Sequence, residues 1–400
     1  MFVVLLLIFE HKWNPYTSLI PVLEENNMNK KPHMGLIIIL LMFPQIVETI
    51  YSPVLPHLVD YFGVSMASAS QTLSIYFIAF AVGVVFWGRI SDLIGRRKAM
   101  LCGLFTYGVG CLLAITATQF DMVMIARVVS AFGAAVGSVI GQTILRDSYE
   151  GKELGKVFSL AIVAVSISPV VGLMSGGLIA EYFGHLVVFS LLLVMAFILL
   201  IVSAFSLPET KPADTKTVSF IGIFTVMLKD RDIWKSAILV ACFNVMMFSY
   251  YSLAPFMFSQ FGLSSIEFGY SGVILAAASV LGSSINKRLL VKEWGSQRLI
   301  QIAVLISFVG AVQVYFCQDS LWFLLGMAAV VVGFGMASPN IFSTALVNYK
   351  QQAGTAGAVL GLLYYCLIGG GLGLAGEIGN LGVVLIGMSL LASTMLMSRD

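Results

Sequence analysis

Two ionised side chains interrupt long apolar stretches of this sequence. Glu48 lies within the apolar run at 35–58, and Arg127 lies within a second run at 121–144. A charged side chain at the centre of a bilayer costs about 2.5 kcal/mol or more, so such residues usually face a protein interior or a water-filled path. A carboxyl group at that depth can bind a proton in one conformation and release it in another. It can also attract a cationic ligand. We therefore take Glu48 and Arg127 as the primary candidate functional residues, and the competing interpretation is a fixed structural ion pair.

Polar residues near these two charges fall on single helix faces. Positions i, i+3 and i+7 of a helix lie on one face, and this spacing relates Gln45, Glu48 and Ser52. Tyr51 lies beside them. The helix that carries Arg127 has a polar face of its own, to which Ser138 belongs. The two charges have similar depths, which predicts that both line one cavity of the N-terminal half.

The C-terminal half has no ionised residue at membrane depth. Its expected cavity face is rich in aromatic residues and comprises Asn244, Met247, Phe248, Tyr251, Tyr364 and Tyr365. Aromatic and methionine side chains adapt to ligands of varied shape, so this face would suit a broad range of apolar molecules. The alternative for each aromatic residue is plain packing between membrane helices.

These residues require a scaffold of membrane helices. Of the 400 residues, 59% are hydrophobic and 10% are charged, and the mean hydropathy is +0.96. An ordinary soluble chain is about 25% charged, so this composition excludes a water-soluble enzyme. The excess apolar surface must face lipid.

Apolar runs long enough to cross a bilayer divide the chain into two groups of six. They lie at 35–58, 67–90, 99–118, 121–144, 155–180, 186–207, 233–258, 266–290, 298–317, 320–345, 353–375 and 380–397. The sequence therefore predicts an all-α membrane protein with twelve transmembrane helices in two pseudo-symmetric bundles. The bundles are expected at 35–207 and 233–400, and a cytoplasmic linker at 208–232, with a short surface helix over 218–228, joins them.

The basic residues lie on one side of this predicted topology. With a cytoplasmic N-terminus, every Lys and Arg except Arg127 falls on the cytoplasmic side. The outer loops and helix ends carry acids instead, namely Asp60, Asp121, Glu181, Glu267, Asp319 and Glu377. Because cytoplasmic loops of membrane proteins are enriched in Lys and Arg, we expect a multi-pass protein of the cell inner membrane with both termini in the cytoplasm.

Residues 1–34 precede the first predicted helix and are expected to form an N-terminal extension. The apolar stretch at 2–9 is too short to span a membrane, and no basic segment precedes it, as a signal peptide requires. Met28 and Met34 are alternative starts. We expect 1–27 to be a misassigned or dispensable segment, which mass spectrometry of the purified protein would test.

The loop between the second and third predicted helices has a recognisable pattern. It reads Gly88-Arg-Ile-Ser-Asp92-Leu-Ile-Gly95-Arg96-Arg97-Lys98. Gly88 would let its helix approach a neighbour closely, and Gly95 would permit a tight turn. Asp92 can accept hydrogen bonds from the amides at a helix N-terminus or from a nearby arginine. The pattern resembles the signature loop of the major facilitator superfamily, in which a glycine, an acid and a second glycine precede basic residues.

Further stretches resemble the Bcr/CflA (bicyclomycin resistance) branch of drug:proton antiporters. They are Gln71-Thr-Leu, Arg146-Asp147, Ser252-Leu-Ala-Pro255-Phe, Ala353-Gly-Thr-Ala356 and Pro53-Val-Leu-Pro56. This resemblance covers 35–397 and implies the major facilitator fold with alternating access. It also implies that Arg127 corresponds to the basic residue of the fourth helix that is associated with proton coupling in the family.

Two departures from the family pattern concern the proposed coupling. The antiporter signature of the fifth helix reads Gly172-Leu-Met-Ser-Gly176-Gly177, with a leucine where the family has proline, and Pro169 precedes it. Many members of the branch also carry an aspartate at the position of Thr49. Here Glu48 is the acid, displaced by about 100° around the helix.

The sequence favours a proton-coupled efflux antiporter for drug-like or amphiphilic small molecules. Its partners would be protons, the exported molecule and the lipid bilayer. The alternatives within transport are a symporter or a dedicated exporter of an endogenous metabolite, such as a siderophore or an amino-acid derivative. A channel is disfavoured because two related halves around a buried carboxylate indicate alternating access.

No enzyme signature accompanies these features. The sequence has no phosphate-binding loop and no metal-ligand spacing, and its four histidines fall in loops or at helix ends. The five cysteines lie within or at the ends of helices as packing residues. We therefore expect a monomer that is not an enzyme and has no cofactor, no metal and no nucleic-acid partner.

Overall fold

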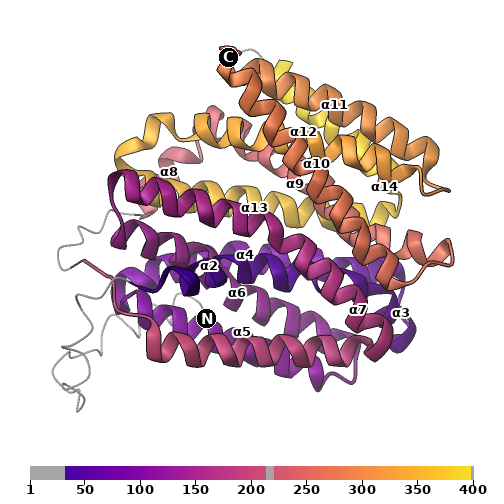
Figure 1. Ribbon diagram of the computed structural model, residues 1–400, viewed down its shortest axis with the longest axis horizontal. Helices are drawn as coiled ribbons and strands as arrows, with labels where there is room; N and C mark the ends of the chain where they lie inside the picture. The colour runs from indigo at the N-terminus through magenta and orange to yellow at the C-terminus, as the bar shows by residue number, and fades with distance from the viewer. Residues whose placement is uncertain (1–31, 213–219, 398–400) are drawn as a thin grey trace.

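The computed structural model describes residues 32–212 and 220–397, and within these ranges the chain is helical and contains no strand (Figure 1). The predicted all-α class is confirmed. The prediction about the translation start concerns residues that lie almost wholly outside the described ranges. The predicted boundaries between the extension, the two halves and the linker stay predictions.

The helices of the N-terminal half follow the predicted apolar runs. They are α2 (Met34–Thr49), the short helices η1 (Ser52–Val54) and α3 (Leu55–Phe62), α4 (Met66–Ile94), α5 (Arg96–Ile115), α6 (Phe120–Ser148) and α7 (Gly151–Ser206). Local sequence sets their ends. Gly63, at φ 63°, ends α3, as glycine does after many helices. The Ser65 hydroxyl then accepts the Ser68 N–H at 3.0 Å and caps α4.

Helix α7 crosses the bundle twice. It has 56 residues, which at about 1.5 Å per residue far exceeds a bilayer core of about 30 Å. Its one residue with non-helical backbone angles is Gly184, at φ 74°. The chain turns back there, because Ala204 near the end of α7 contacts Arg97 at the start of α5. The two arms correspond to the predicted helices at 155–180 and 186–207.

The C-terminal half repeats the long-helix pattern. Its elements are α8 (Phe220–Met227), α9 (Arg231–Gln260), α10 (Ser265–Val291), α11 (Ser296–Cys317), α12 (Phe323–Ala345), η2 (Val347–Gln352), α13 (Ala353–Ile378) and α14 (Leu381–Met397). The short helix α8 matches the one expected in the linker. Its Ile223 and Met227 are buried in a small apolar cluster that also contains residues of α9 and α13.

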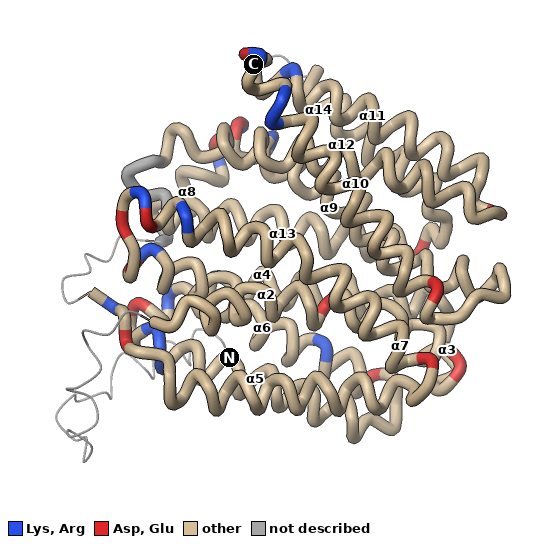
Figure 2. The backbone as a smooth tube through the Cα atoms, viewed as in Figure 1, with Lys and Arg blue, Asp and Glu red and all other residues tan. Residues whose placement is uncertain are grey.

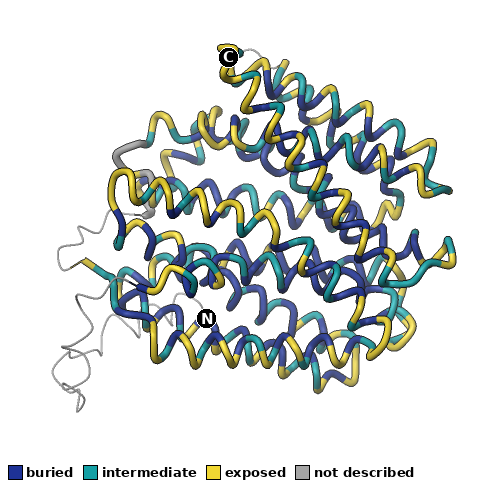
Figure 3. The backbone as a smooth tube through the Cα atoms, viewed as in Figure 1, coloured by how far each residue is buried: buried dark blue, intermediate teal, exposed yellow. Residues whose placement is uncertain are grey.

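The described residues account for twelve membrane crossings. Ten helices are long and apolar enough to span a bilayer, and α14 is a shorter apolar helix. One of the ten is α7, which supplies two crossings. Large apolar side chains such as Phe105, Phe197, Val280 and Leu305 are 61–64% exposed on the outside of the bundle (Figure 3). An exposed apolar belt of this kind fits a lipid environment.

Charge distinguishes the two ends of the bundle (Figure 2). At one end, called the basic end, Lys and Arg gather where helices start or finish (Figure 2). Arg96 begins α5, Arg146 lies in the last turn of α6, Lys235 lies near the start of α9, and Lys292 follows α10. The opposite, acidic end carries Asp60, Asp121, Glu181, Glu267, Asp319 and Glu377, and no described Lys or Arg lies there. The structure therefore has the charge asymmetry on which the predicted topology depends.

Helices α7 and α10, from opposite halves, converge towards the acidic end (Figure 1). A Cβ atom added to Gly177 would collide with the carbonyl oxygen of Ser265, and one added to Gly269 would lie 2.8 Å from the carbonyl oxygen of Leu173. Nearer the basic end, α7 buries a single face, while Ile162 and Val163 are exposed. The two helices thus form a V that is closed at the acidic end.

Hydrogen bonds also join the halves towards the acidic end. Six that involve side chains of the described residues connect Ser52 to Tyr251, His57 to Ser265, Gln71 to Gly373 and to Glu377, Ser74 to Gly369, and Glu181 to Ser265. These contacts close the acidic end of the path between the halves.

Candidate functional site

Glu48 and Arg127 are buried in the N-terminal half without an ion pair between them. Their exposed fractions are 4% and 5%. Among the described residues, Glu48 Oε1 and the Nε and Nη2 atoms of Arg127 have no hydrogen-bond partner. The two groups are within electrostatic range of each other, yet no described ion pair within 4.0 Å joins them. This conformation does not contain the fixed structural pair.

Two tyrosine rings hold the guanidinium of Arg127. Its Cζ atom lies 3.9 Å from the ring centroid of Tyr51 and 4.2 Å from that of Tyr76. Both rings are fully buried, and at such distances a cation is attracted to the ring face. The sequence predicted Tyr51 as a site residue but not Tyr76, which α4 contributes.

The predicted first crossing at 35–58 corresponds to one span, Met34–Phe62, and its regular α-helical hydrogen bonding is interrupted next to the site. Helix α2 ends at Thr49, and η1 begins at Ser52. Pro53 causes the break because it has no N–H to donate to the preceding turn. The Ser52 hydroxyl donates a hydrogen bond to the carbonyl oxygen of Tyr251 in the other half. Ser52 therefore joins the halves and does not extend an unbroken polar stripe.

The remaining polar candidates of the N-terminal half are not drawn into the same cluster. Gln45 and Ser138 are half-buried. Among the described residues, no hydrogen bond links either side chain to Glu48 or Arg127. Their predicted role in a substrate cavity stays a prediction.

An aromatic cluster spans the two halves beside this site. Predicted residues of the C-terminal half form part of it, with ring centroids 5.7 Å apart for Phe248 and Tyr251 and 4.4 Å apart for Tyr364 and Tyr365. Phe77 of α4 completes the contact across the halves, at 4.5 Å from Phe248 and 6.2 Å from Tyr365.

Two further members of α4 extend this aromatic cluster. The ring of Phe80 lies 5.0 Å from Tyr365 and 6.0 Å from Tyr76. Tyr76 and Phe80 are four residues apart and so share a helix face. That spacing was the one signal by which the sequence could have indicated an aromatic face on this helix.

Asn244 and Met247 lie close in sequence to this cluster on α9. The Asn244 amide donates to the carbonyl oxygen of Val240 at 2.8 Å, which is a local contact within the helix. Met247 is half-buried and packs against the main apolar core. Neither contact assigns a role in ligand binding, so both residues remain candidates.

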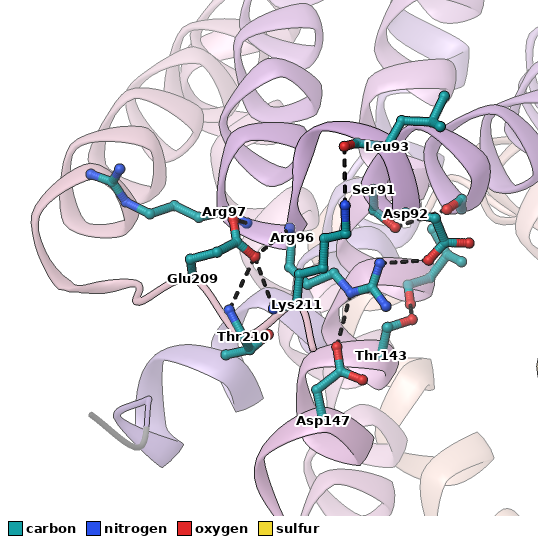
Figure 4. A network of polar contacts seen from close by, with 12 residues as sticks. Ser91, Asp92, Leu93, Arg96, Arg97, Thr143, Asp147, Glu209, Thr210 and Lys211 are labelled. Carbon is teal, nitrogen blue, oxygen red and sulfur yellow. Dashed lines mark hydrogen bonds and ion pairs between the residues drawn. The ribbon is translucent and has the colours of Figure 1, made fainter. Parts of the chain in front are cut away.

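The signature loop at the basic end forms a polar network around Arg96 (Figure 4). Arg96 Nη1 donates to Asp92 Oδ1 at 2.5 Å, and Arg96 Nε donates to Asp147 Oδ2 at 2.8 Å. Arg96 is 3% exposed, and its contact with Asp147 is largely buried, whereas the side chain of Asp92 is 40% exposed. The predicted contact between Asp92 and an arginine is thus present, and Arg96 connects the end of α4 to the end of α6.

The two glycines of the loop behave differently. Gly95 has φ 97°, a conformation that favours glycine, so the predicted tight turn is confirmed. Gly88 does not permit close helix packing as expected, because a Cβ there would lie 3.5 Å from Val139, an ordinary contact. The close approach occurs at Gly83, where a Cβ would lie 2.7 Å from the carbonyl oxygen of Phe132.

Glu209 is a member of this network that the sequence did not identify (Figure 4). Its Oε1 accepts the backbone N–H of Arg96 at 2.8 Å, and its Oε2 accepts that of Arg97 at 3.2 Å. Arg97 also donates from Nη2 to the carbonyl oxygen of Ala204 at 2.5 Å. A carboxylate is favourable at a helix N-terminus, so Glu209 holds the segment after α7 against the start of α5.

The glycines of the fifth-helix signature let α7 pack closely against α2 and α10. Cβ atoms on Gly172 and Gly176 would collide with Thr49 and Ile50 at the end of α2, while Gly177 faces α10. The signature therefore lies where both halves meet, next to the break after Glu48. No residue near Pro169 departs from helical backbone angles.

No described group of three or more His, Cys, Asp or Glu residues could hold a metal ion. Glu48 and Arg127 border neither the pocket lined by Lys287, Arg288 and Lys292 nor the pocket at the acidic end lined by Met66, Phe256 and Glu377. What the site offers, among the described residues, is a buried carboxyl with no ion-pair partner and a buried guanidinium held by two aromatic rings, both near the junction between the halves. Such a pair can exchange a proton and bind an ion without covalent chemistry.

The family model of the Major Facilitator Superfamily matches residues 37–374. An uncharacterized transporter of Rickettsia felis is 33% identical over 337 residues, which are 80% of this chain and 83% of the relative. Multidrug resistance protein D of Escherichia coli is 26% identical over 339 residues, 82% of this chain and 84% of the relative. A bicyclomycin resistance protein homolog of Haemophilus influenzae is 24% identical over 343 residues, 82% and 85% of the two chains.

Among solved structures, the crystal structure of a D-xylose-proton symporter has a TM-score of 0.72 with this chain at 15% identity. The match covers 91% of this chain and 96% of that one. At this identity the likeness concerns the fold alone, and it agrees with two bundles of six helices.

Proposed function

The chain belongs to the major facilitator superfamily and resembles its Bcr/CflA branch, and from that premise we propose that it is a proton-coupled efflux antiporter for drug-like or amphiphilic small molecules. Relatives named for multidrug and bicyclomycin resistance support an efflux role. The observation that supports the proposed coupling is the buried Glu48 carboxyl, which has no ion-pair partner within residues 32–212 and 220–397 although Arg127 is within electrostatic range.

The position of Glu48 would link proton exchange at its carboxyl group to movement of the two halves. Glu48 immediately precedes the break in the first crossing, where Ser52 contacts Tyr251 of the other half. A carboxylate there attracts a cationic or polarised substrate, and protonation releases it. Because the two states of Glu48 differ by a full charge at low dielectric, they would favour different arrangements of the junction.

The orientation follows from the charge asymmetry. We place the basic end and both termini in the cytoplasm of a bacterial inner membrane, as the distribution of Lys and Arg favours. The conformation described above would then be closed towards the outside. We further propose that the chain works as a monomer, as a transporter and not an enzyme, with protons and the exported molecule as its partners.

Glu48→Gln tests the coupling role. We expect this variant to lose efflux of a fluorescent cation from an efflux-deficient host, while its abundance and thermal stability stay near those of the wild type. Glu150→Gln removes a carboxylate from an exposed position at the basic end and serves as the matched control, with efflux unchanged. Undiminished gradient-driven efflux by Glu48→Gln would contradict the coupling role.

One observation favours a second candidate, an exporter dedicated to an endogenous metabolite such as an amino-acid derivative or a siderophore. An acid and a base that are both buried and unpaired could bind the two charges of a zwitterion. A panel of drugs and metabolites, measured as accumulation in the same host, separates the candidates. Export of one zwitterion without any drug efflux would favour this alternative.

A further inference from the structure

A pocket of about 350 Å³ lies at the acidic end, between the two halves. The N-terminal half contributes Met66 at the start of α4. The C-terminal half contributes Phe256 and Met257 of α9, Asp319 between α11 and α12, and Glu377 at the end of α13. The volume falls within the range of about 300–1,000 Å³ that is typical of small-molecule sites.

The lining combines an apolar wall with negative charge. Phe256 is 7% exposed and Met257 is half-buried, whereas the carboxylates of Asp319 and Glu377 are exposed to solvent. No Lys or Arg is among the lining residues. An aromatic or aliphatic body against the wall and a positive charge near the carboxylates would satisfy both surfaces.

The pocket exists because the acidic end is closed. Gln71 of α4 donates from Nε2 to Glu377 Oε1 at 3.1 Å and to the carbonyl oxygen of Gly373 at 3.0 Å. These bonds hold α4 against α13, next to Met66. If the halves separate at this end, Met66 moves away from the remaining wall, so a ligand that contacts both sides binds the closed state more tightly.

We propose that this pocket is a second ligand site, separate from the transport site, which binds amphiphilic organic cations from the outer side and favours the state in which the acidic end is closed. Its location on the outer side rests on the orientation proposed above. Its chemistry does not involve Glu48, which lies near the middle of the first crossing.

Propidium, an aromatic dication that does not cross membranes, is a suitable probe because its fluorescence rises in apolar surroundings. It is added to nuclease-treated, right-side-out membrane vesicles that contain the protein. We expect saturable binding that weakens with ionic strength. Asp319→Asn should raise the Kd about threefold, as expected for an exposed charge, and Met257→Ala should also raise it.

Two matched variants separate this site from other sources of binding. Asp121→Asn removes an exposed carboxylate at the acidic end outside the pocket and should leave the Kd unchanged. Glu48→Gln should retain saturable binding that Asp319→Asn still weakens, even where efflux is lost and the population of the closed state changes.

Three results would overturn the proposal. They are an unchanged Kd in Asp319→Asn, an equal loss in Asp121→Asn, and complete loss of saturable binding in Glu48→Gln, which would place the dye in the transport site. Binding to inside-out vesicles alone would overturn the orientation as well.

Discussion

Two tyrosine rings take the place that a carboxylate would have beside Arg127. A guanidinium stays charged at any pH a cell encounters, so it needs a partner that does not depend on the protonation of Glu48. The faces of Tyr51 and Tyr76 meet this need because their attraction for a cation does not titrate in that range. Glu48 can therefore change its proton state without leaving Arg127 unsupported.

Substitutions of Tyr76 test this role. Tyr76→Phe keeps the ring and should leave thermal stability and the pH profile of efflux near those of the wild type. Tyr76→Leu removes the ring and should cost about 2 kcal/mol of stability. Arg127 would then turn to Glu48 and hold it ionised, so the pH profile of efflux should shift to lower pH. Equal behaviour of the two variants would contradict the role of the ring.

Glu48 and Arg127 could be found from sequence because ionised residues at membrane depth are rare and costly. Tyr76 and Phe77 could not be found in the same way. Aromatic residues are common in apolar helices, and only the packing of α4 against α6, α9 and α13 gives these two their contacts with Arg127, Phe248 and Tyr365. The roles of all these residues in transport stay predictions.

At the scale of the elements, α7 connects the site to the closed end. Gly172 and Gly176 pack on the end of α2 beside Glu48, and Gly177 packs on α10 of the other half. The helix thus contacts the region of the proposed coupling residue Glu48 on one face and the closed end on another, within less than two turns. A small shift at α2 can be transmitted along a rigid helix to the contact with α10.

Gly177→Val tests the contact between α7 and α10. The added side chain would collide with the backbone of Ser265, so we expect the acidic end to open. Spin labels on α4 and α10 at that end should report a longer distance by pulsed electron resonance, and efflux should fall at least about tenfold. The matched control is Gly155→Val on the same helix, where a Cβ would meet nothing within 4 Å. A wild-type distance distribution in Gly177→Val would contradict the proposed closure.

The sequence predicted an element well where the residues of that one segment determine its structure. Apolar length located the crossings, and Gly95 indicated its own tight turn. Gly88 and Glu209 show the limit. Whether a glycine permits close packing depends on which residue of the neighbouring helix lies opposite, and Glu209 is separated by more than 100 residues from the amides that it caps.

At the scale of the whole molecule, the two ends differ in both charge and closure. The distribution of Lys and Arg could be derived from the sequence because it follows from counting loops. The sequence could not show which end is closed, since closure depends on contacts between the halves such as those of Gln71, Ser74 and Glu181. Alternating access requires these contacts to break in each cycle.

A disulfide across the closed end tests this requirement directly. A Cβ atom on Gly373 would lie 3.8 Å from the Cβ atom of Ser74, which is the usual separation in a disulfide, about 3.8 Å. The double variant Ser74→Cys/Gly373→Cys should therefore cross-link on oxidation, lose efflux and regain it on reduction.

The single variants under the same oxidant control for the five native cysteines. If the double variant cross-links completely, by mass spectrometry of the joined peptides, and still transports, the halves do not separate at this end. Alternating access through the acidic end would then be wrong. The opposite result is that only the double variant loses efflux and that only reduction restores it. The bonds of Gln71 and Ser74 with α13 would then have to open once in every transport cycle.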